Sequence, residues 1–396
     1  MKTRIQRLQV VVVLALALLL PATAVASDHA DPIILRTLDA GITGLFAFSD
    51  GEDLALILTV RRAINGTPES YDLEGFEYAV HLDTHSQVTW NNRADNERYG
   101  GTVVHPEGIS ADATIRFKLD NKGEFVRGYP DLQGFQGDNI RPSEAFSGLR
   151  DDPFIFPRFA TTNVMAIVVK IPFSAFQGNP QSFLIWGTTH GKGLFGGRKQ
   201  IDHVGRSARS QAGRFDFLNT IAPDTHVREI EARIHGMQAR VTSALTHAMS
   251  HTGIGAPGDL FKYVLALRET YDVFPDVMIY RRNAPNGDKY PNGRRPEDDI
   301  VGKTCEVGDC VLQEVASFEA PAGEFPRVTV HTPPASRQFP YLTAPLPKDP
   351  ELVAAHGDPC LRNFLLLLLA VFILLTLWRR WWLKKKETPW VRPHYS

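Results

Sequence analysis

The sequence predicts a mainly β protein: an antiparallel β-sandwich with a helical insertion or cap, together with a signal peptide and a C-terminal transmembrane helix. Three observations lead to this prediction. Short apolar segments separated by turn residues fill the first half of the chain, a helical pattern follows them, and strongly hydrophobic stretches lie near both ends. Strands of this length and spacing are typical of sandwiches.

Seven segments have the composition of strands. In residues 115–119 the apolar side chains take every second place, which is the pattern of a strand with one buried face. The last two segments are more continuously apolar, so we expect them at the centre of a sheet. The predicted strands are residues 44–50, 54–62, 76–83, 113–120, 124–129, 163–172 and 182–189.

The pattern changes to that of a helix after Phe217. Apolar residues recur at helical spacing from Val227 to Leu245, with charged residues between them. A second helix is predicted from Pro257 to Tyr271. We therefore expect the helical insertion or cap at about residues 224–271.

Both ends of the chain predict export and anchoring. Residues 1–26 have the basic start, short apolar run and small-residue end of a secretory signal peptide. Residues 361–383 form a hydrophobic stretch followed by a basic cluster, which predicts a transmembrane helix with residues 384–396 in the cytoplasm. The alternatives are an uncleaved anchor at the start, and a core helix or a removable sorting signal at the end.

These segments define the predicted domain organisation. An extracytoplasmic β-rich domain covers residues 27–319, and a proline-rich stalk of residues 320–360 leads to the membrane. The predicted location is the cell membrane, with a single span and most of the chain on the periplasmic or extracytoplasmic side. The formal charge of −1 gives no reason to expect a nucleic-acid partner.

The cysteines agree with an oxidising compartment. Cys305 and Cys310 enclose four residues, and we expect a disulfide between them. A redox pair or half of a metal site is the alternative for these two residues. Cys360 is left over beside the predicted span, where it could crosslink to a protein partner.

Two groups of histidines and acids suggest a divalent metal ion as a possible cofactor. His29 and Asp31 lie at tight spacing near the predicted start of the mature chain. His81, Asp83 and His85 would share one face of a strand if that strand continued to His85. Imidazole and carboxylate groups suit several divalent ions. The alternative is that these residues are ordinary polar positions at strand ends.

Three clusters of arginine and aspartate occur on segments that we expect to be loops. If the clusters meet, their ion pairs would fix the geometry of the loops. In particular, we expect Asp298 and Asp299 to pair with an arginine of another cluster. The functional alternative is a basic pocket for an anionic ligand, or a cation site lined by aspartates. The residues of the network are Arg150, Asp151, Asp152, Asp202, Arg206, Arg294, Arg295, Asp298 and Asp299.

Several motifs, taken in order, resemble the bacterial domain-of-unknown-function 4331 (DUF4331) family. They are "SDHADPI", "GITGLFAFSD", "EYAVHLDTHSQ", "GLRDDPFIF", "NVMAIVVKIP", "QIDHVGR" and "YPNGRRPEDDIV", and they cover most of residues 27–315. The opening lacks the Arg-Glu of the family pattern, and the turn at His85 is less acidic. The resemblance implies an exported, β-rich protein and brings no established activity with it.

The sequence contains no P-loop, no GxSxG and no HExxH motif, so it gives no sign of a particular reaction. We therefore expect a ligand-binding or assembly module, with no catalytic residue assigned. A metal-dependent hydrolase or oxidoreductase is the first alternative. A structural subunit of a membrane complex is the second, with its partner bound through the ectodomain or Cys360.

Overall fold

The computed structural model describes residues 38–62, 71–137, 140–153, 163–192, 197–206, 213–234, 274–306 and 336–346. All of them belong to one compact unit, Ala22–Pro347. The predicted signal peptide, the predicted span at residues 361–383 and the predicted tail lie outside the described residues. No helix among the described segments is apolar and long enough to cross a bilayer.

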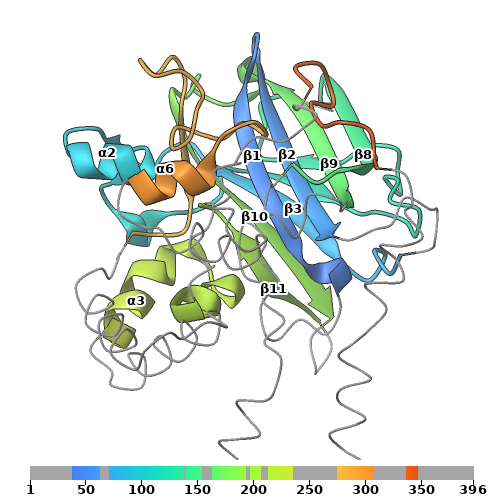
Figure 1. Ribbon diagram of the computed structural model, residues 1–396, viewed down its shortest axis with the longest axis horizontal. Coiled ribbons are helices and arrows are strands. Elements are labelled where there is room, and N and C mark those ends of the chain that lie inside the picture. The colour runs from blue at the N-terminus through green and yellow to red at the C-terminus, as the bar shows by residue number, and fades with distance from the viewer. Residues whose placement is uncertain are drawn as a thin grey trace, which may run out of the picture. The chain divides into compact units, whose positions relative to one another are not determined.

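The described chain is mainly β, with antiparallel sheets and a few short helices, as predicted (Figure 1). Its strands are β1 Ile42–Asp50, β2 Asp53–Arg62, β3 Glu77–Asp83, β4 Val88–Thr89, β5 Thr102–Val103, β6 Ala113–Phe117, β7 Asp131–Gln133, β8 Glu144–Asp151, β9 Asn163–Pro172, β10 Ser182–Lys192, β11 Arg198–Val204 and β12 Met278–Arg281. Its α-helices are α2 Arg93–Tyr99, α3 His226–Ile234 and α6 Ile300–Glu306. Its 3-10 helices are Leu38–Ala40, Pro106–Gly108, Phe173–Ala175, Gly213–Thr220 and Pro223–Thr225.

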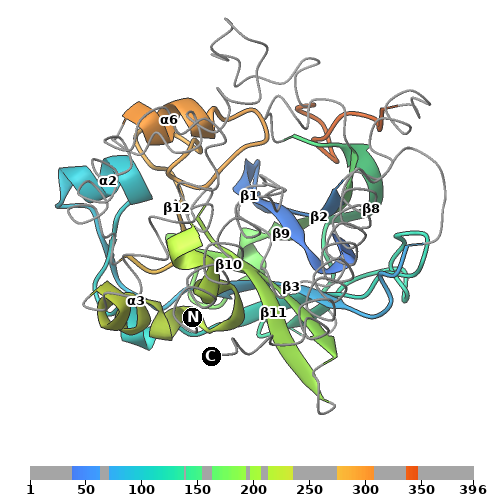
Figure 2. The same ribbon diagram turned by 60° about the horizontal axis from the view of Figure 1, so that its bottom comes forward.

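Two larger sheets carry the fold. The four-stranded sheet has the order β1-β2-β9-β8, and the six-stranded sheet has the order β11-β10-β3-β6-β7. Strand β12 also belongs to the second sheet and pairs with the first part of β10, while β11 pairs with its last part. Both neighbours lie on one side of β10 because β3 occupies the other (Figure 2).

The two sheets share one apolar core, because alternate side chains of each point toward the other sheet. The first sheet contributes residues such as Leu56 and Ile167, and the second contributes Val80, Ile115 and Ile185. All five are almost fully buried. At roughly 25 cal/mol for each Å² of apolar area, this shared core is the main stabilising term of the fold.

The outer face of the four-stranded sheet is apolar as well. We use this name for the side chains that point away from the shared core, namely Phe46, Phe48, Ala55, Ile57, Ala166 and Val168. Residues Tyr341 and Leu342 pack against it. The segment 336–346 lies beside β8 and β9 in both views (Figures 1 and 2). Residues 320–360 were predicted to leave the domain as a stalk, and the structure corrects this for 336–346, whose aromatic and leucine side chains are buried on the sheet.

The outer face of the six-stranded sheet is polar near its centre. His81 projects there from β3, and its ring stacks on Trp186 with 5.3 Å between centroids. The two ring nitrogens of His81 lie 3.2 Å from the Thr114 hydroxyl and 2.8 Å from the Thr188 hydroxyl. Burial is the main reason that the pKa of His81 falls from 6.5 to about 3. His81 is therefore neutral in the folded protein at ordinary pH.

Candidate functional site

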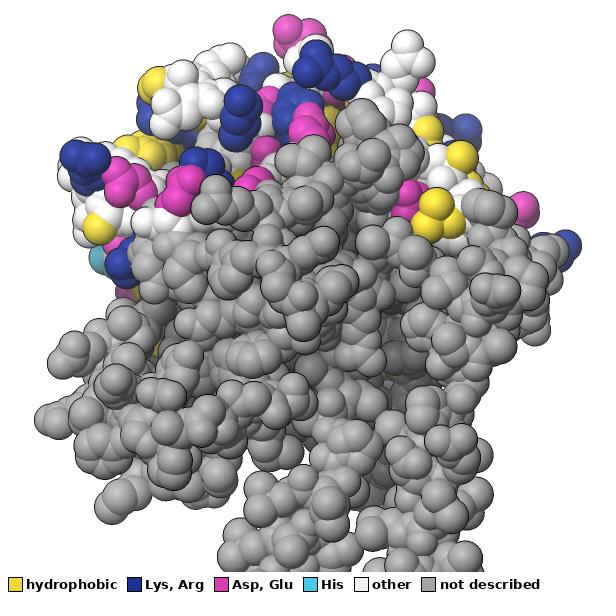
Figure 3. Space-filling model, viewed as in Figure 1, with side chains coloured by type: hydrophobic (Ala, Val, Ile, Leu, Met, Phe, Trp, Pro, Cys, Tyr) yellow, Lys and Arg dark blue, Asp and Glu magenta, His cyan; other side chains and the backbone are white. Residues whose placement is uncertain are grey.

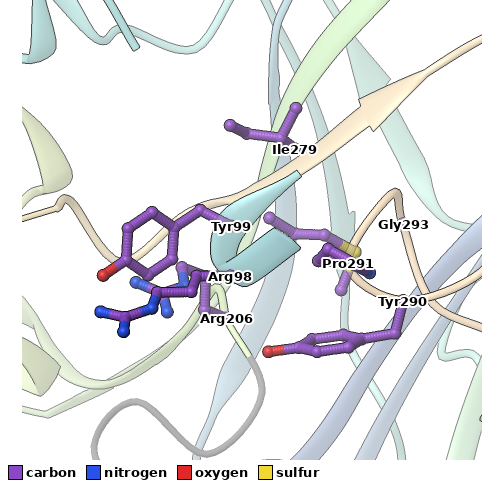
Figure 4. Close-up of a pocket in the computed structure, with 8 residues that line it drawn as sticks. Arg98, Tyr99, Arg206, Ile279, Tyr290, Pro291 and Gly293 are labelled. Carbon is purple, nitrogen blue, oxygen red and sulfur yellow. The ribbon is translucent and has the colours of Figure 1, made fainter. Parts of the chain in front are cut away.

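A small pocket lies where four segments of the chain meet, between α2, the end of β11, β12 and the loop that follows β12 (Figure 4). It encloses an empty volume of about 230 Å³. The lining residues are Arg98, Tyr99, Arg206, Met278, Ile279, Tyr290, Pro291 and Gly293.

Two glycines allow these segments to approach one another so closely. Gly100 ends α2 with a positive φ of 81°, and a Cβ at this position would lie 2.4 Å from the carbonyl oxygen of Pro291. Gly205 precedes Arg206, and a Cβ there would lie 2.1 Å from the carbonyl oxygen of Asp276. Any other residue would push the segments apart, so glycine at both positions is required for the pocket.

The position of Arg206 is fixed by a pair of aromatic rings. Its guanidinium carbon lies 3.9 Å from the ring centroid of Tyr99 and 5.3 Å from that of Phe274. The two rings are themselves stacked, with centroids 4.4 Å apart. The backbone N–H of Arg206 donates to Asp276 Oδ1 over 2.7 Å. A guanidinium over stacked rings keeps its charge in a defined place at the pocket wall.

Arg98 brings a second positive charge to the same wall. It is in the last turn of α2 and its side chain is exposed. In Figure 4 the side chains of Arg98 and Arg206 lie beside Tyr99, while the ring of Tyr290 lies on the other side of the pocket. Within the described segments no carboxylate forms an ion pair with Arg98. Two guanidinium groups and two phenol groups offer hydrogen-bond donors to an anion.

The surroundings of the pocket do not form a large field of one sign. On the described part of the face in Figure 3, basic and acidic side chains are interspersed. This agrees with the formal charge of −1. Any attraction for an anion therefore comes from the local pair of arginines, because the whole molecule contributes little long-range steering.

The first predicted charge cluster lies at the end of a strand and not on a loop. Arg150 and Asp151 are the last residues of β8. The Arg150 guanidinium lies 4.0 Å from the ring centroid of Phe146, and burial lowers its pKa. Asp151 and Asp152 are each only 2% exposed. The hydroxyl of Thr343 donates to Asp151 Oδ2 over 3.3 Å, so this cluster helps to hold residues 336–346.

The second cluster joins the two sheets. Asp202 is in β11, is fully buried, and accepts the N–H of Ile42 over 2.8 Å. Ile42 is the first residue of β1, so this bond connects an edge strand of one sheet to an edge strand of the other. Asp202 therefore has a structural role, and Arg206 alone from this cluster lines the pocket.

The third cluster closes the free edge of β1. Arg294 and Ala47 exchange two backbone hydrogen bonds, of 2.9 and 3.0 Å. The Arg294 guanidinium lies 4.1 Å from the ring centroid of Phe46, and the Arg295 guanidinium lies 4.5 Å from that of Phe48. An edge strand covered in this way cannot pair with another chain.

Asp298 and Asp299 shape the same segment locally. Asp298 Oδ2 accepts the backbone N–H groups of Tyr290 and Arg295, over 2.9 and 2.8 Å, and burial raises its pKa. Asp299 Oδ1 accepts the N–H of Gly302 over 2.7 Å and so caps α6. We expected ion pairs with an arginine of another cluster, and this is corrected: neither carboxylate forms one with Arg150 or Arg206 among the described residues.

The predicted metal ligands on β3 do not come together. Strand β3 ends at Asp83, whose carboxylate accepts the N–H groups of His85, Ser86 and Ser110. His85 is exposed and pairs with Asp112 at 2.8 Å, which raises its pKa. In the part of the chain that the structure describes, no three His, Cys, Asp or Glu side chains form a group that could hold a metal ion.

Some predicted site residues fall outside the described part. His29, Asp31 and Cys310 are among them. Cys305 is in α6, and its disulfide with Cys310 stays a prediction. Of the pocket lining, the predicted network contained Arg206 alone. The signal that could have found Arg98 and Tyr99 is the Gly100-Gly101 pair directly after a short helix.

No model of a known protein family matches this chain, and no curated protein matches it either. The resemblance to the DUF4331 family therefore stays a prediction.

Proposed function

We propose that this chain is an exported, membrane-tethered β-sandwich of the DUF4331 type that binds an anionic group in the pocket between Arg98 and Arg206. It is a binding or assembly module rather than an enzyme. The observation that carries the proposal is the pocket itself: two guanidinium groups and two tyrosines converge on one small cavity.

The size of the pocket limits what it can hold. Cofactor and drug-sized sites have volumes of roughly 300–1,000 Å³, and the empty volume here is about 230 Å³. The pocket therefore suits a small anion, such as an inorganic oxyanion, or one carboxylate group of a larger molecule. It is too small to enclose a nucleotide.

The chemistry of the wall agrees with this choice. A guanidinium group can donate two parallel hydrogen bonds to a carboxylate or an oxyanion, and such charge-assisted bonds are the stronger ones in proteins. Arg206 is held in place by Tyr99 and Asp276, whereas Arg98 is exposed and free to close on a ligand. One fixed and one movable arginine is a suitable arrangement for capture of an anion.

The test is calorimetric titration of the purified protein with inorganic phosphate, sulfate, acetate and succinate at low ionic strength. We expect saturable binding of at least one probe, and Arg98→Gln should weaken it about 10- to 100-fold, because one charged hydrogen-bond donor contributes roughly 1.5–3 kcal/mol.

The matched control is Arg93→Gln. Arg93 is on the same helix and is also exposed, but it pairs with Glu97 at 2.7 Å and does not line the pocket. Binding should be the same in this variant and in the wild type. Equal losses in both variants, or no heat with any probe at millimolar concentration, would refute the proposal.

A further inference from the structure

The segment 336–346, which we call the strap, is held on the outer face of the four-stranded sheet by apolar contacts. The ring of Tyr341 meets that of Phe48 edge-on, with centroids 4.9 Å apart and an angle of 82° between the planes. Phe339 packs against Tyr341 in the same way at 5.8 Å. Tyr341 and Leu342 are 3% and 4% exposed, so both side chains are inserted rather than resting on the surface.

Polar contacts fix the strap at both ends of the sheet. At one end the Tyr341 hydroxyl donates to Asp50 Oδ2 over 2.7 Å. At the other end Asn163 and Leu346 exchange two hydrogen bonds, in which the Asn163 amide pairs with the backbone of Leu346 over 2.8 and 3.0 Å. Asp50 ends β1 and Asn163 begins β9, so the strap runs along the whole length of the sheet.

An ion network supports the first of these anchors. Lys170 Nζ lies 2.9 Å from Asp50, 3.0 Å from Glu144 and 3.6 Å from Asp53. The hydrogen bond with Lys170, followed by that with Tyr341, lowers the pKa of Asp50. Asp50 is therefore held as a carboxylate that can accept from a phenol group.

The backbone of the strap is also specialised. Tyr341 has a positive φ of 66°, a conformation that a bulky residue rarely adopts. Such a conformation costs free energy and persists only where the surroundings compensate for it. Here the inserted ring and its hydrogen bond compensate, so the sheet recognises this particular shape of the segment.

We propose that the outer face of the four-stranded sheet is a peptide-docking surface, and that the strap of a second copy of this chain can occupy it in place of the chain's own strap. The surface selects an aromatic–Pro–Tyr–Leu segment through the Phe48 contact, the Asp50 acceptor and the Asn163 amide pair.

Exchange between copies is possible because of the position of the strap in the sequence. Residues 307–335 connect α6 to the strap, and residues 347 onward continue beyond it. A long connection of this kind lets a segment leave its own domain and dock on an identical one at little entropic cost. On a membrane, where the predicted span would concentrate the chains, exchange would be favoured further.

The experiment uses the full chain with Tyr341→Ala and Leu342→Ala, and a fluorescent peptide with the sequence of residues 338–346. The variant should bind the peptide saturably. The wild-type chain should bind it at least 10-fold more weakly, because its own strap competes. A peptide in which the tyrosine is replaced by alanine is the control and should not bind the variant.

A second measurement tests exchange between whole chains. The variant that lacks a functional strap is mixed with differently labelled wild-type chain, and the mixture is followed by fluorescence energy transfer. A signal that the unlabelled peptide abolishes would support the proposal. If the variant does not fold, Tyr341→Phe is used instead, since it removes only the bond to Asp50, and the peptide should then bind more tightly than it binds to wild type.

Two results would overturn the inference. Equal binding of the peptide to wild type and to the variant would place its site elsewhere on the molecule. Peptide binding without energy transfer between chains would mean that the strap serves only its own domain. Neither result depends on the arginine pocket, so the two proposals fail separately.

Discussion

The outer faces of the two sheets differ in what covers and stabilises them. On the four-stranded sheet the face is made of rings and aliphatic side chains, and Tyr341 and Leu342 pack against it. On the six-stranded sheet the central position is a histidine held between two threonine hydroxyl groups. The shared core between the sheets is apolar on both sides.

This difference teaches that the two faces depend on different forces. Apolar packing is tolerant of direction but sensitive to lost volume, whereas a buried polar group depends on each of its hydrogen bonds. The first face can therefore accept a different occupant of similar shape. The second face cannot lose a single partner without leaving a polar atom unsatisfied.

Phe48→Ala should give the largest effect and would break the apolar side of the comparison. The ring is 1% exposed, and removal of a buried aromatic ring costs about 3–5 kcal/mol of unfolding free energy. Urea unfolding would measure the loss. Val126→Ala is the control, because that side chain is 59% exposed and should change stability by less than about 0.5 kcal/mol. A loss below about 1 kcal/mol for Phe48→Ala would contradict the burial of this face.

Thr188→Val tests the polar side with almost no change in volume. It removes the hydroxyl group that lies 2.8 Å from His81 Nε2, and a buried polar atom without a partner costs about 1–3 kcal/mol. Ile57→Val on the other face should cost only about 0.5–1.5 kcal/mol, although it removes a methylene group. The comparison would be wrong if the threonine substitution proved harmless.

The pH dependence of stability should come partly from the polar face. His81 has a folded pKa of about 3 and an unfolded value near 6.5, so the unfolded chain binds more protons between these limits. Its contribution is complete above pH 6.5 and is lost as the pH falls toward 3, by about 1.4 kcal/mol for each pH unit. In His81→Gln this part of the slope should be absent. Parallel pH profiles for the two proteins would show that His81 is not buried as described.

Asp299→Ala should have the smallest effect and sharpens the role of the charged segment. We expect a loss of about 1 kcal/mol, because the carboxylate caps α6 through the N–H of Gly302. Thermal unfolding would detect a fall of a few degrees. Asp299→Asn, which retains a capping oxygen, should restore most of the loss. A fall of ten degrees or more would instead indicate a buried ion pair.

The strands with continuous or alternating apolar patterns could be predicted from the sequence. The prediction of residues 163–172 is confirmed as β9, and the other central strands differ from prediction by a few residues at their ends. Residues 124–129 were predicted as a strand, and here the structure shows one isolated bridge between Leu119 and Phe125 instead. The turn that follows it contains Gly128 at a positive φ, which ends the extended backbone.

The strands that the sequence analysis missed are mainly at sheet edges. Strands β8 and β11 carry charged residues and were interpreted as loops, yet each is the last strand of its sheet. An edge strand faces solvent on one side and is often charged, so its pattern resembles that of a loop. The pocket was missed for another reason: its lining comes from positions between 98 and 293, and no local pattern connects them.

The way β1 is completed has a consequence for how this chain matures. Its hairpin with β2 can form as soon as both strands have been synthesised. Its N–H at Ile42, its free edge at Ala47 and the acceptor at Asp50 must wait for Asp202, Arg294 and Tyr341. Until translation and any translocation reach those residues, the hairpin carries an open edge and bare aromatic rings, which are the features that chaperones bind and that nascent chains aggregate through.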